Sequence, residues 1–319
     1  MKVVITARNF VLEEDKRAIT LLKESGCEIV DKSGWNQGTS SAEENAKLLE
    51  GADAAIVAME EINDFVLQKC PKLKFISRRG IGYDSIDIEA CRKRGVSVSR
   101  TTGTVEGAVA EHVIAYILHF AREIFLQNEE MHRGIWNRKM MYGAKNRVLG
   151  LVGFGGIGKE IAKRANALGM EVRYYCRHPK KEWEETYHAR YCDLPELLAV
   201  SDYVSVNVPL TDSTRGMFDA EKFALMKPES VFINVARAPV MDEKALREAL
   251  DQKQLRGACV DVFDHEPCTD SLLASSERAV LTPHTASFTS ENFGEMNLRA
   301  AQNVIEYFEG CLAEKYLVI

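Results

Sequence analysis

The chain has 319 residues, of which 46% are hydrophobic and 28% are charged, and its formal net charge at pH 7 is −6. This composition is typical of a globular protein with a large apolar core, and the length predicts two domains. The negative charge argues against general binding to nucleic acids or to anionic membranes. The first residues show no signal-peptide pattern and no apolar run approaches ~18 residues, so we expect a cytoplasmic protein that does not enter a membrane.

In the first third of the chain, short Val- and Ile-rich runs alternate with amphipathic stretches. The expected strands are 3–6, 54–57 and 73–76, and the expected helices are about 13–25, 62–69 and 86–94. Alternation of this kind predicts a parallel sheet with helices on both faces. The apolar runs are continuous rather than alternating, as in strands that are buried on both sides.

A second α/β series follows a long apolar helix expected at 105–125. Its strands are expected at 148–152, 171–175, 202–206, 230–233, 258–262 and 279–281. Six strands with intervening helices make a complete doubly wound unit. The last helical stretch, about 290–310, lies beyond that unit, and we expect it to pack against the first domain. The predicted domains are therefore 1–100 with 288–319, and 101–287.

A glycine-rich segment joins the first strand of the second series to a helix. It reads Gly153-Phe-Gly-Gly-Ile-Gly158, which contains G-x-G-x-x-G. Such glycines permit a tight turn, a close backbone approach to a pyrophosphate and close helix packing, and the helix N-terminus attracts the phosphates. A simple strand-to-helix turn is the alternative, but the flanking strand and helix favour a dinucleotide site. Residues 101–287 are thus the expected dinucleotide-binding domain.

The end of the second strand in this series indicates which dinucleotide is bound. A site for NAD places Asp or Glu there, to bind the ribose 2′-hydroxyl. Here Cys176 holds the position, and Arg177, His178 and Lys180 follow it. Cations suit a 2′-phosphate, so the sequence favours NADP, with NAD possible. The alternative is that these are solvated loop charges.

Three later strands each end in ionisable residues. Arg237 follows the strand at 230–233, Asp261 and Glu266 stand at the end of the next strand, and His284 follows the last one. Ligands in an open α/β sheet bind beyond the carboxyl ends of its strands, so these residues are expected to face a substrate. A purely structural role for these residues is a poor explanation of why three successive strands each end in an ionisable residue.

Together with Arg78-Arg-Gly-Ile-Gly-Tyr-Asp-Ser-Ile-Asp87 and Asn207-Val-Pro-Leu-Thr211, these segments carry a family resemblance. The chain resembles the D-isomer-specific 2-hydroxyacid dehydrogenases over essentially its whole length. The resemblance implies an α/β fold in which a Rossmann cofactor domain is inserted in a flavodoxin-like substrate domain. It also implies hydride transfer between a nicotinamide and C2 of a small 2-keto or 2-hydroxy acid, and a homodimer in which Trp136 anchors an arm.

The resemblance also implies roles for individual residues. Arg237 would hold the substrate carboxylate and polarise the C2 carbonyl, a task that suits a guanidinium. His284 would exchange a proton with the carbonyl oxygen, and Glu266 would orient the imidazole and stabilise its cationic form. Asp261 is expected near the nicotinamide end of the cofactor, and no metal ion is expected in the site.

The full set of residues expected to contact the cofactor and the substrate is larger. The cofactor-binding residues are Gly153, Gly155, Gly156, Ile157, Gly158, Cys176, Arg177, His178, Lys180, Val208, Pro209, Thr214, Val235, Ala236, Arg237, Asp261, His284 and Ala286. The substrate-binding residues are Arg79, Gly80, Ile81, Gly82, Arg237 and His284.

The sequence leaves the substrate open. Glyoxylate or hydroxypyruvate reduction suits NADPH and a short acid, and the runner-up is D-3-phosphoglycerate oxidation. Arg78 and Arg79 would serve a phosphate, whereas the acidic Met59-Glu-Glu61 segment opposes it. A dinucleotide-sensing corepressor is the alternative from another class of protein, and a flavin or S-adenosylmethionine protein is disfavoured by the Arg–Glu–His set.

Overall fold

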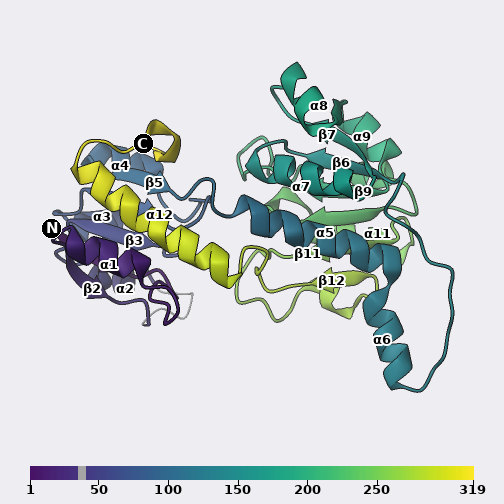
Figure 1. The fold of residues 1–319 in the computed structure, drawn as a ribbon, viewed down its shortest axis with the longest axis horizontal. Coiled ribbons are helices and arrows are strands. Elements are labelled where there is room, and N and C mark those ends of the chain that lie inside the picture. The colour runs from purple at the N-terminus through teal and green to yellow at the C-terminus, as the bar shows by residue number, and fades with distance from the viewer. Residues whose placement is uncertain (35–40) are drawn as a thin grey trace. The chain divides into compact units, whose positions relative to one another are not determined.

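The computed structural model describes residues 1–34 and 41–319. The chain divides into two compact units, the first formed by Met1–Val105 with Phe288–Ile319 and the second by Glu106–Ser287 (Figure 1). Residues 101–105 belong to the first unit, although the sequence predicts the boundary at 100. The backbone N–H of Thr101 donates to the Gly80 carbonyl at 3.0 Å, and Gly80 N–H donates to Thr101 Oγ1 at 2.8 Å, so this segment is tied to the strand ending at Arg78.

The first unit is built on a parallel five-stranded sheet in the order β2-β1-β3-β4-β5. The strands are β1 (Lys2–Ile5), β2 (Glu28–Asp31), β3 (Ala54–Val57), β4 (Phe75–Arg78) and β5 (Ser97–Arg100). The helices before the return of the chain are α1 (Arg17–Glu24), α2 (Ala42–Leu48), α3 (Asp64–Lys69) and α4 (Ile88–Arg94). The sequence does not reveal β2 and β5, because these edge strands carry partly exposed and polar residues instead of a continuous apolar run.

Helix α12 (Ser290–Phe308) returns the chain to the first unit and crosses its sheet (Figure 1). Ala300, Ala301 and Val304 are fully buried among core residues of the unit. Ser77 Oγ donates to the Ala300 carbonyl at 2.9 Å, and Asn303 Nδ2 donates to Ser99 Oγ at 3.2 Å. The helix is followed by η3 (Glu314–Tyr316).

The second unit contains a parallel seven-stranded sheet in the order β12-β11-β10-β9-β6-β7-β8. The strands are β6 (Val148–Val152), β7 (Glu171–Tyr175), β8 (Ala189–Tyr191), β9 (Tyr203–Val206), β10 (Val231–Asn234), β11 (Gly257–Val260) and β12 (Ala279–Leu281). The helices are α5 (Glu106–Arg122), α6 (Ile124–His132), α7 (Gly156–Ala167), α8 (Lys181–Tyr187), α9 (Leu194–Val200), α10 (Ala220–Ala224), η1 (Ala238–Val240), α11 (Glu243–Asp251) and η2 (Leu272–Ser275). The predicted fold class, two doubly wound parallel α/β sheets, is confirmed.

Two features of the second unit differ from the sequence prediction. The sheet has a seventh strand, β8, which is only three residues long and lies at the edge. The helix expected at 105–125 is divided into α5 and α6, because Glu123 between them takes the left-handed backbone conformation, with φ of 45°. None of the helices in the described part of the chain is long and apolar enough to cross a membrane.

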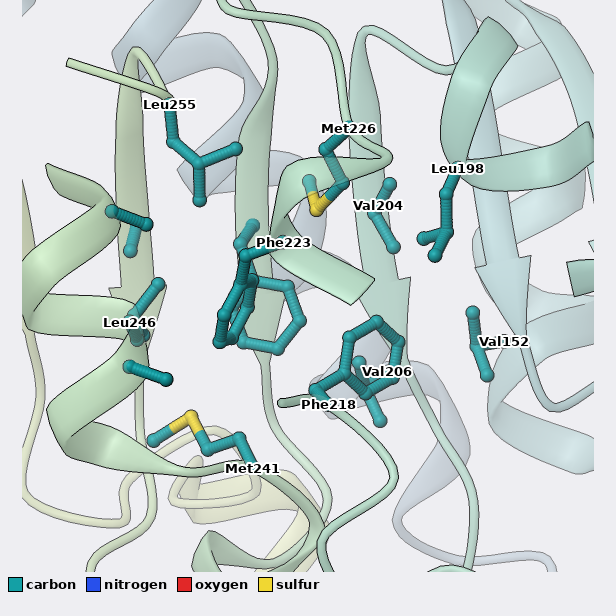
Figure 2. Close-up of a cluster of buried hydrophobic side chains, with 14 of the residues drawn as sticks. Val152, Leu198, Val204, Val206, Phe218, Phe223, Met226, Met241, Leu246 and Leu255 are labelled. Atoms are coloured by element: carbon teal, nitrogen blue, oxygen red, sulfur yellow. The ribbon is translucent and has the colours of Figure 1, made fainter. Parts of the chain in front are cut away.

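A large apolar cluster covers one face of the second sheet (Figure 2). The rings of Phe218, Phe223 and Phe232 pack together, with centroids 5.0 to 6.2 Å apart. Val204 and Val206 of β9 and Val152 of β6 are completely buried in the same cluster. Burial of each such side chain stabilises the fold by about 1.5–3 kcal/mol. This core fixes the strands, and with them the positions at which their carboxyl ends emerge.

The strand order reverses between β6 and β9. Chain segments after β6 run outward through β7 and β8, and those after β9 run the other way through β10, β11 and β12. The loops at the carboxyl ends of β6 and β9 therefore diverge, which leaves a crevice where ligands bind in doubly wound sheets. The fold thus places the glycine-rich segment and the later ionisable residues at the same edge of the sheet.

A substitution at Gly257 tests the close packing of α5 against this sheet. A Cβ atom there would lie 2.2 Å from Phe120 Cε1 and 2.9 Å from the Arg278 carbonyl oxygen. Gly257→Ala is expected to lower the free energy of unfolding by about 1–3 kcal/mol through overpacking. Gly34→Ala, where a Cβ meets nothing within 4 Å, is the control. Equal stability of the two variants in chemical denaturation would contradict the packing described here.

Candidate active site

The glycine-rich turn between β6 and α7 has room for glycine alone at two positions. Gly153 has φ of +97°, and a Cβ on it would lie 2.8 Å from the Asn207 carbonyl oxygen. A Cβ on Gly158 would lie 2.5 Å from the Gly153 carbonyl oxygen. The first glycine therefore permits the turn against the chain that leaves β9, and the second permits α7 to pack on the turn.

The N-terminus of α7 is open to an anion. Within the described residues no side chain caps this helix, and a Cβ built on its N-cap residue, Gly155, meets nothing within 4 Å. The backbone N–H groups of the first turn, including those of Gly156 and Ile157, carry the positive end of the helix dipole. The Glu106 side chain packs against Gly156, where a Cβ would lie 2.8 Å from its Cγ, whereas the backbone at Gly155 is open and fits a pyrophosphate group.

Cationic residues surround the end of β7. Cys176 follows the strand, and the backbone of His178 interacts with its thiol. Arg177 and Lys180 are exposed. Burial raises the pKa of the Cys176 thiol, and the nearby Lys159 ammonium opposes that rise. The sequence prediction did not include Lys159.

Lys159 and Lys180 share one aromatic side chain. Their Nζ atoms lie 4.0 Å and 5.3 Å from the centre of the Trp183 ring. Burial, and then the Lys180 charge, lower the pKa of Lys159. A usable sequence signal existed, because Lys159 directly follows the third glycine and so lies on the first turn of α7. Its proximity to the loop after β7 depends on packing that the sequence does not display.

The other predicted cofactor residues of this unit lie in the loops after β9 and β10. After β9, Thr214 Oγ1 donates to the Pro209 carbonyl at 2.7 Å, which closes the loop that also contains Val208. After β10, Ala236 N–H donates to Asn234 Oδ1 at 3.0 Å, and Val235 lies between them. Both loops leave the carboxyl edge of the sheet on which the glycine turn lies.

The three predicted catalytic residues come from neighbouring strands. Arg237 follows β10, where its backbone carbonyl accepts a hydrogen bond from Asn234 Nδ2 at 3.0 Å. Glu266 follows β11 and accepts the Phe263 N–H at 3.0 Å through Oε1. Its second oxygen, Oε2, lies 2.7 Å from His284 Nδ1, in the loop after β12. The structure therefore brings the carboxylate and the imidazole of the prediction into direct contact.

The electrostatics of Glu266 agree with an ionised carboxylate. Partial burial acts to raise the pKa of this carboxyl, but the hydrogen bond and charge of His284, the Phe263 N–H and the Arg237 charge together hold it below its ordinary value. The carboxylate thus faces the His284 imidazole and the Arg237 guanidinium. It fixes His284 through Nδ1 and leaves Nε2 as the nitrogen able to exchange a proton with a ligand.

Asp261 holds the loop that carries His284. Its side chain is only 1% exposed. One carboxylate oxygen accepts the Thr285 N–H at 2.8 Å and the Thr282 hydroxyl, and the other accepts the Ala286 N–H at 2.9 Å. The loop needs this support because His284 takes a left-handed backbone conformation, with φ of 53°, which is unfavourable for residues other than glycine. Both oxygens of the predicted cofactor residue are thus engaged by the chain on either side of His284.

Two side chains of α5 extend this polar network. His112 Nε2 lies 3.2 Å from Thr282 Oγ1 and 4.0 Å from Asp261 Oδ1, and the Tyr116 hydroxyl also bonds to Thr282. Burial lowers the pKa of His112, while the Asp261 charge acts in the other direction. The sequence prediction did not include His112 among the site residues. The signal was its one-turn spacing from Tyr116, which places both side chains on the same helix face.

The predicted substrate residues of the first unit lie in the segment after β4. Arg79 is buried there, with Nη1 3.2 Å from Asn297 Oδ1 and its guanidinium 4.7 Å from the centre of the Phe293 ring. Burial lowers the pKa of Arg79 to about 10. Gly80 has φ of +126°, and Ile81 and Gly82 are half-buried. Arg79 therefore anchors α12, a contact that the sequence prediction did not contain.

Asp261→Asn tests the support of the His284 loop. The substitution replaces one carboxylate oxygen by an NH2 group, which would meet a buried N–H donor instead of accepting from it. An unsatisfied buried donor costs about 1–3 kcal/mol, and we expect that loss in the free energy of unfolding. The control is Asp264→Asn, because Asp264 is an exposed carboxylate of the same loop. Unchanged stability of Asp261→Asn would show that the carboxylate does not hold the loop.

Comparison with known proteins places these features in context. The family model described as "D-isomer specific 2-hydroxyacid dehydrogenase, NAD binding domain" matches residues 114–286. Glyoxylate/hydroxypyruvate reductase B of Escherichia coli (strain K12) is 37% identical over 282 residues, which cover 86% of this chain and 87% of the relative. Glyoxylate reductase of Thermococcus litoralis is 38% identical over 260 residues, which cover 79% of this chain and 78% of the relative. The crystal structure of a glyoxylate reductase from Paecilomyes thermophila superposes with a TM-score of 0.87 at 27% identity, covering 100% of this chain and 98% of that one.

Proposed function

This chain belongs to the D-isomer specific 2-hydroxyacid dehydrogenase family, and we propose that it reduces glyoxylate and hydroxypyruvate with NADPH as the preferred hydride donor. As a member, it is a nicotinamide-dependent oxidoreductase that transfers a hydride to or from C2 of a small 2-hydroxy acid. The observation that carries the proposal is the 2.7 Å contact between His284 and Glu266, with the Arg237 charge beside it. The choice of short 2-keto acids comes from the names of the relatives.

Each side chain of the set has a separate chemical task. Arg237 binds the substrate carboxylate and draws electron density from the C2 carbonyl. His284 gives the Nε2 proton to the carbonyl oxygen as C2 is reduced, and takes it back in the oxidative direction. Glu266 keeps the imidazole oriented and stabilises its charged form. The bound nicotinamide supplies the hydride, and the protein orients and protonates the substrate.

The preference for NADPH rests on the cations at the end of β7. Cys176 stands where a carboxylate would bind a ribose 2′-hydroxyl, so a 2′-phosphate meets no negative side chain at that position. Arg177 offers a planar pair of donors, and Lys159 and Lys180 add ammonium groups around Trp183. The Lys159 charge also acts to lower the pKa of the Cys176 thiol, so Lys159 of α7 lies near the proposed 2′-phosphate subsite at the end of β7.

A phosphorylated 2-hydroxy acid is the second candidate substrate. Arg78 ends β4, Arg100 ends β5, and Arg79 adds a third guanidinium to this edge of the first sheet. Such a cluster suits a phosphate. Glu60, which is buried near Arg79, opposes it by supplying a negative charge. We therefore place this substrate second.

A homodimer is part of the proposal. The surface of α6 and of the segment after it is unusually apolar, and Figure 1 shows both extending away from the sheet of the second unit. Its exposed side chains are Ile124, Phe125, Leu126, Met131, Ile135, Trp136, Met140 and Tyr142. Many exposed apolar side chains in one segment are typical of a protein–protein interface. A second copy of this chain is the proposed partner.

Replacing His284 tests the catalytic assignment. His284→Ala is expected to lower kcat by at least ~10²-fold, the usual contribution of a general acid. Binding of NADPH, followed by its fluorescence, is expected to persist because the glycine turn is unchanged. Exposed His132→Ala is the matched control. Full activity of His284→Ala would remove the imidazole from the mechanism.

Arg177 and Lys159 test the cofactor preference. Arg177→Gln and Lys159→Gln are each expected to raise KM for NADPH at least ~10-fold, because a charge-assisted hydrogen bond is worth about 1.5–3 kcal/mol. KM for NADH is expected to change little, since NADH has no 2′-phosphate. Lys244→Gln, which changes an exposed side chain of α11, serves as control. Equal rises in KM for NADPH and NADH would exclude a specific role of these side chains in binding the 2′-phosphate.

Light scattering after size-exclusion chromatography tests the dimer. The unaltered protein is expected to have twice the chain mass, and Trp136→Asp is expected to shift it toward one chain mass by placing charge in the apolar surface. Leu225→Asp changes an exposed leucine elsewhere in the unit and is expected to leave the mass unchanged. A monomeric unaltered protein would contradict the proposed interface.

A further inference from the structure

The loop after Glu266 contains a cluster of three side chains that the catalytic mechanism does not use. His265, Cys268 and Asp270 each direct one potential ligand atom to the same point, and these atoms lie within 4.8 Å of one another. His265 Nε2 is 2.8 Å from Asp270 Oδ1, and Cys268 Sγ is 3.7 Å from the same oxygen. Nitrogen, sulfur and oxygen atoms are thus assembled at one place.

The distances are close to those that a tetrahedral metal centre needs. Bonds of 2.0–2.3 Å to nitrogen, oxygen and sulfur place neighbouring ligand atoms about 3.3–3.6 Å apart. The sulfur–oxygen pair already has nearly this spacing, and the His–Asp pair would open by about half an ångström as a metal replaced the hydrogen bond between them. The His–Cys pair, whose ligand atoms lie within 4.8 Å of each other, would close by up to about 1.3 Å, so side-chain rotations with a small movement of the loop form the site.

The surroundings also suit a metal ion. The side chains of His265 and Asp270 are 66% and 70% exposed, so an ion reaches them from solvent and water completes the coordination. The loop is held at both ends. Glu266 accepts the Phe263 N–H and bonds to His284, while Ser271 bonds to Glu243 and to the Leu273 N–H. A loop ordered in this way loses little conformational freedom when it binds an ion.

We propose that His265, Cys268 and Asp270 bind one thiophilic divalent cation such as Zn²⁺, and that this slows catalysis. The cation binds the thiolate, so binding releases the thiol proton to solvent. Thiolate and imidazole together select a borderline metal over Mg²⁺ or Ca²⁺. Because Glu266 lies between two of the ligands, closing the cluster around a metal shifts the chain that orients His284. The effect on turnover rests on the proposed function, whereas the binding itself does not.

Cobalt provides a direct test that is independent of activity. Chelator-treated protein without a polyhistidine tag is titrated with Co²⁺, and the near-ultraviolet charge-transfer absorption of a cobalt–thiolate bond is followed. One equivalent is expected to bind, and added Zn²⁺ is expected to remove the absorption. Cys268→Ser should abolish the absorption, and His265→Ala should weaken binding at least ~10-fold. Cys311→Ser, which changes another exposed thiol, should keep it.

Absence of the absorption in the unaltered protein, or its persistence in Cys268→Ser, would overturn the site. His265 and Asp270 are exposed and Cys268 is half-buried, so equal melting temperatures are expected to show that the variants fold. Turnover is then measured with and without Zn²⁺. A saturable fall in kcat that a chelator reverses, and that Cys268→Ser lacks, supports the coupling. Zn²⁺ binding with unchanged kcat overturns the coupling to Glu266. Absence of turnover in the metal-free enzyme would contradict the proposed function but not the metal site.

Discussion

The hydrogen bond between Glu266 and His284 is the contact on which the proposed active site depends. It joins the loops that leave two neighbouring strands, β11 and β12, at a distance of 2.7 Å. The loop after β12 needs such support because His284 is in a left-handed backbone conformation that costs energy. The parallel sheet supplies the alignment, since all its strands present their carboxyl ends at one edge.

Support for this contact comes from behind the site. Asp261 is buried and satisfies three donors of the chain around His284, and Thr282 passes the network to His112 and Tyr116 on α5. A buried carboxylate is tolerated only when its oxygens are fully hydrogen-bonded. Here the same bonds that satisfy the charge also define the loop. Helix α5 is thus part of the frame of the site as well as part of the apolar packing.

Much of this could be predicted from the sequence, because the central strands are continuous apolar runs and the functional residues follow them directly. Arg237, Glu266 and His284 were proposed as catalytic residues in this way, and the structure brings Glu266 and His284 into contact. Edge strands β2, β5 and β8 escaped prediction because their exposed residues break the apolar pattern. The interruption of the helix at Glu123, between α5 and α6, contains neither glycine nor proline, so no sequence signal marks it.

Other features depend on tertiary contacts that no local pattern displays. Lys159 reaches the end of β7 only because α7 packs beside α8, and His112 meets Thr282 across 170 positions of sequence. Arg79 is a further case: its place in a family segment predicts a substrate contact, and its guanidinium also stacks on Phe293 of α12, a contact that no local pattern displays. Burial and hydrogen-bond partners, not residue type, decide the role in each instance.

The most direct measurement is the initial rate of NADPH and of NADH oxidation with glyoxylate, hydroxypyruvate, pyruvate and 3-phosphohydroxypyruvate. The account predicts rapid oxidation with glyoxylate or hydroxypyruvate and a kcat/KM at least ~10-fold higher with NADPH, the discrimination expected from about 1.4 kcal/mol of phosphate binding. No turnover of any of these acids, by protein that binds NADPH tightly, would contradict it.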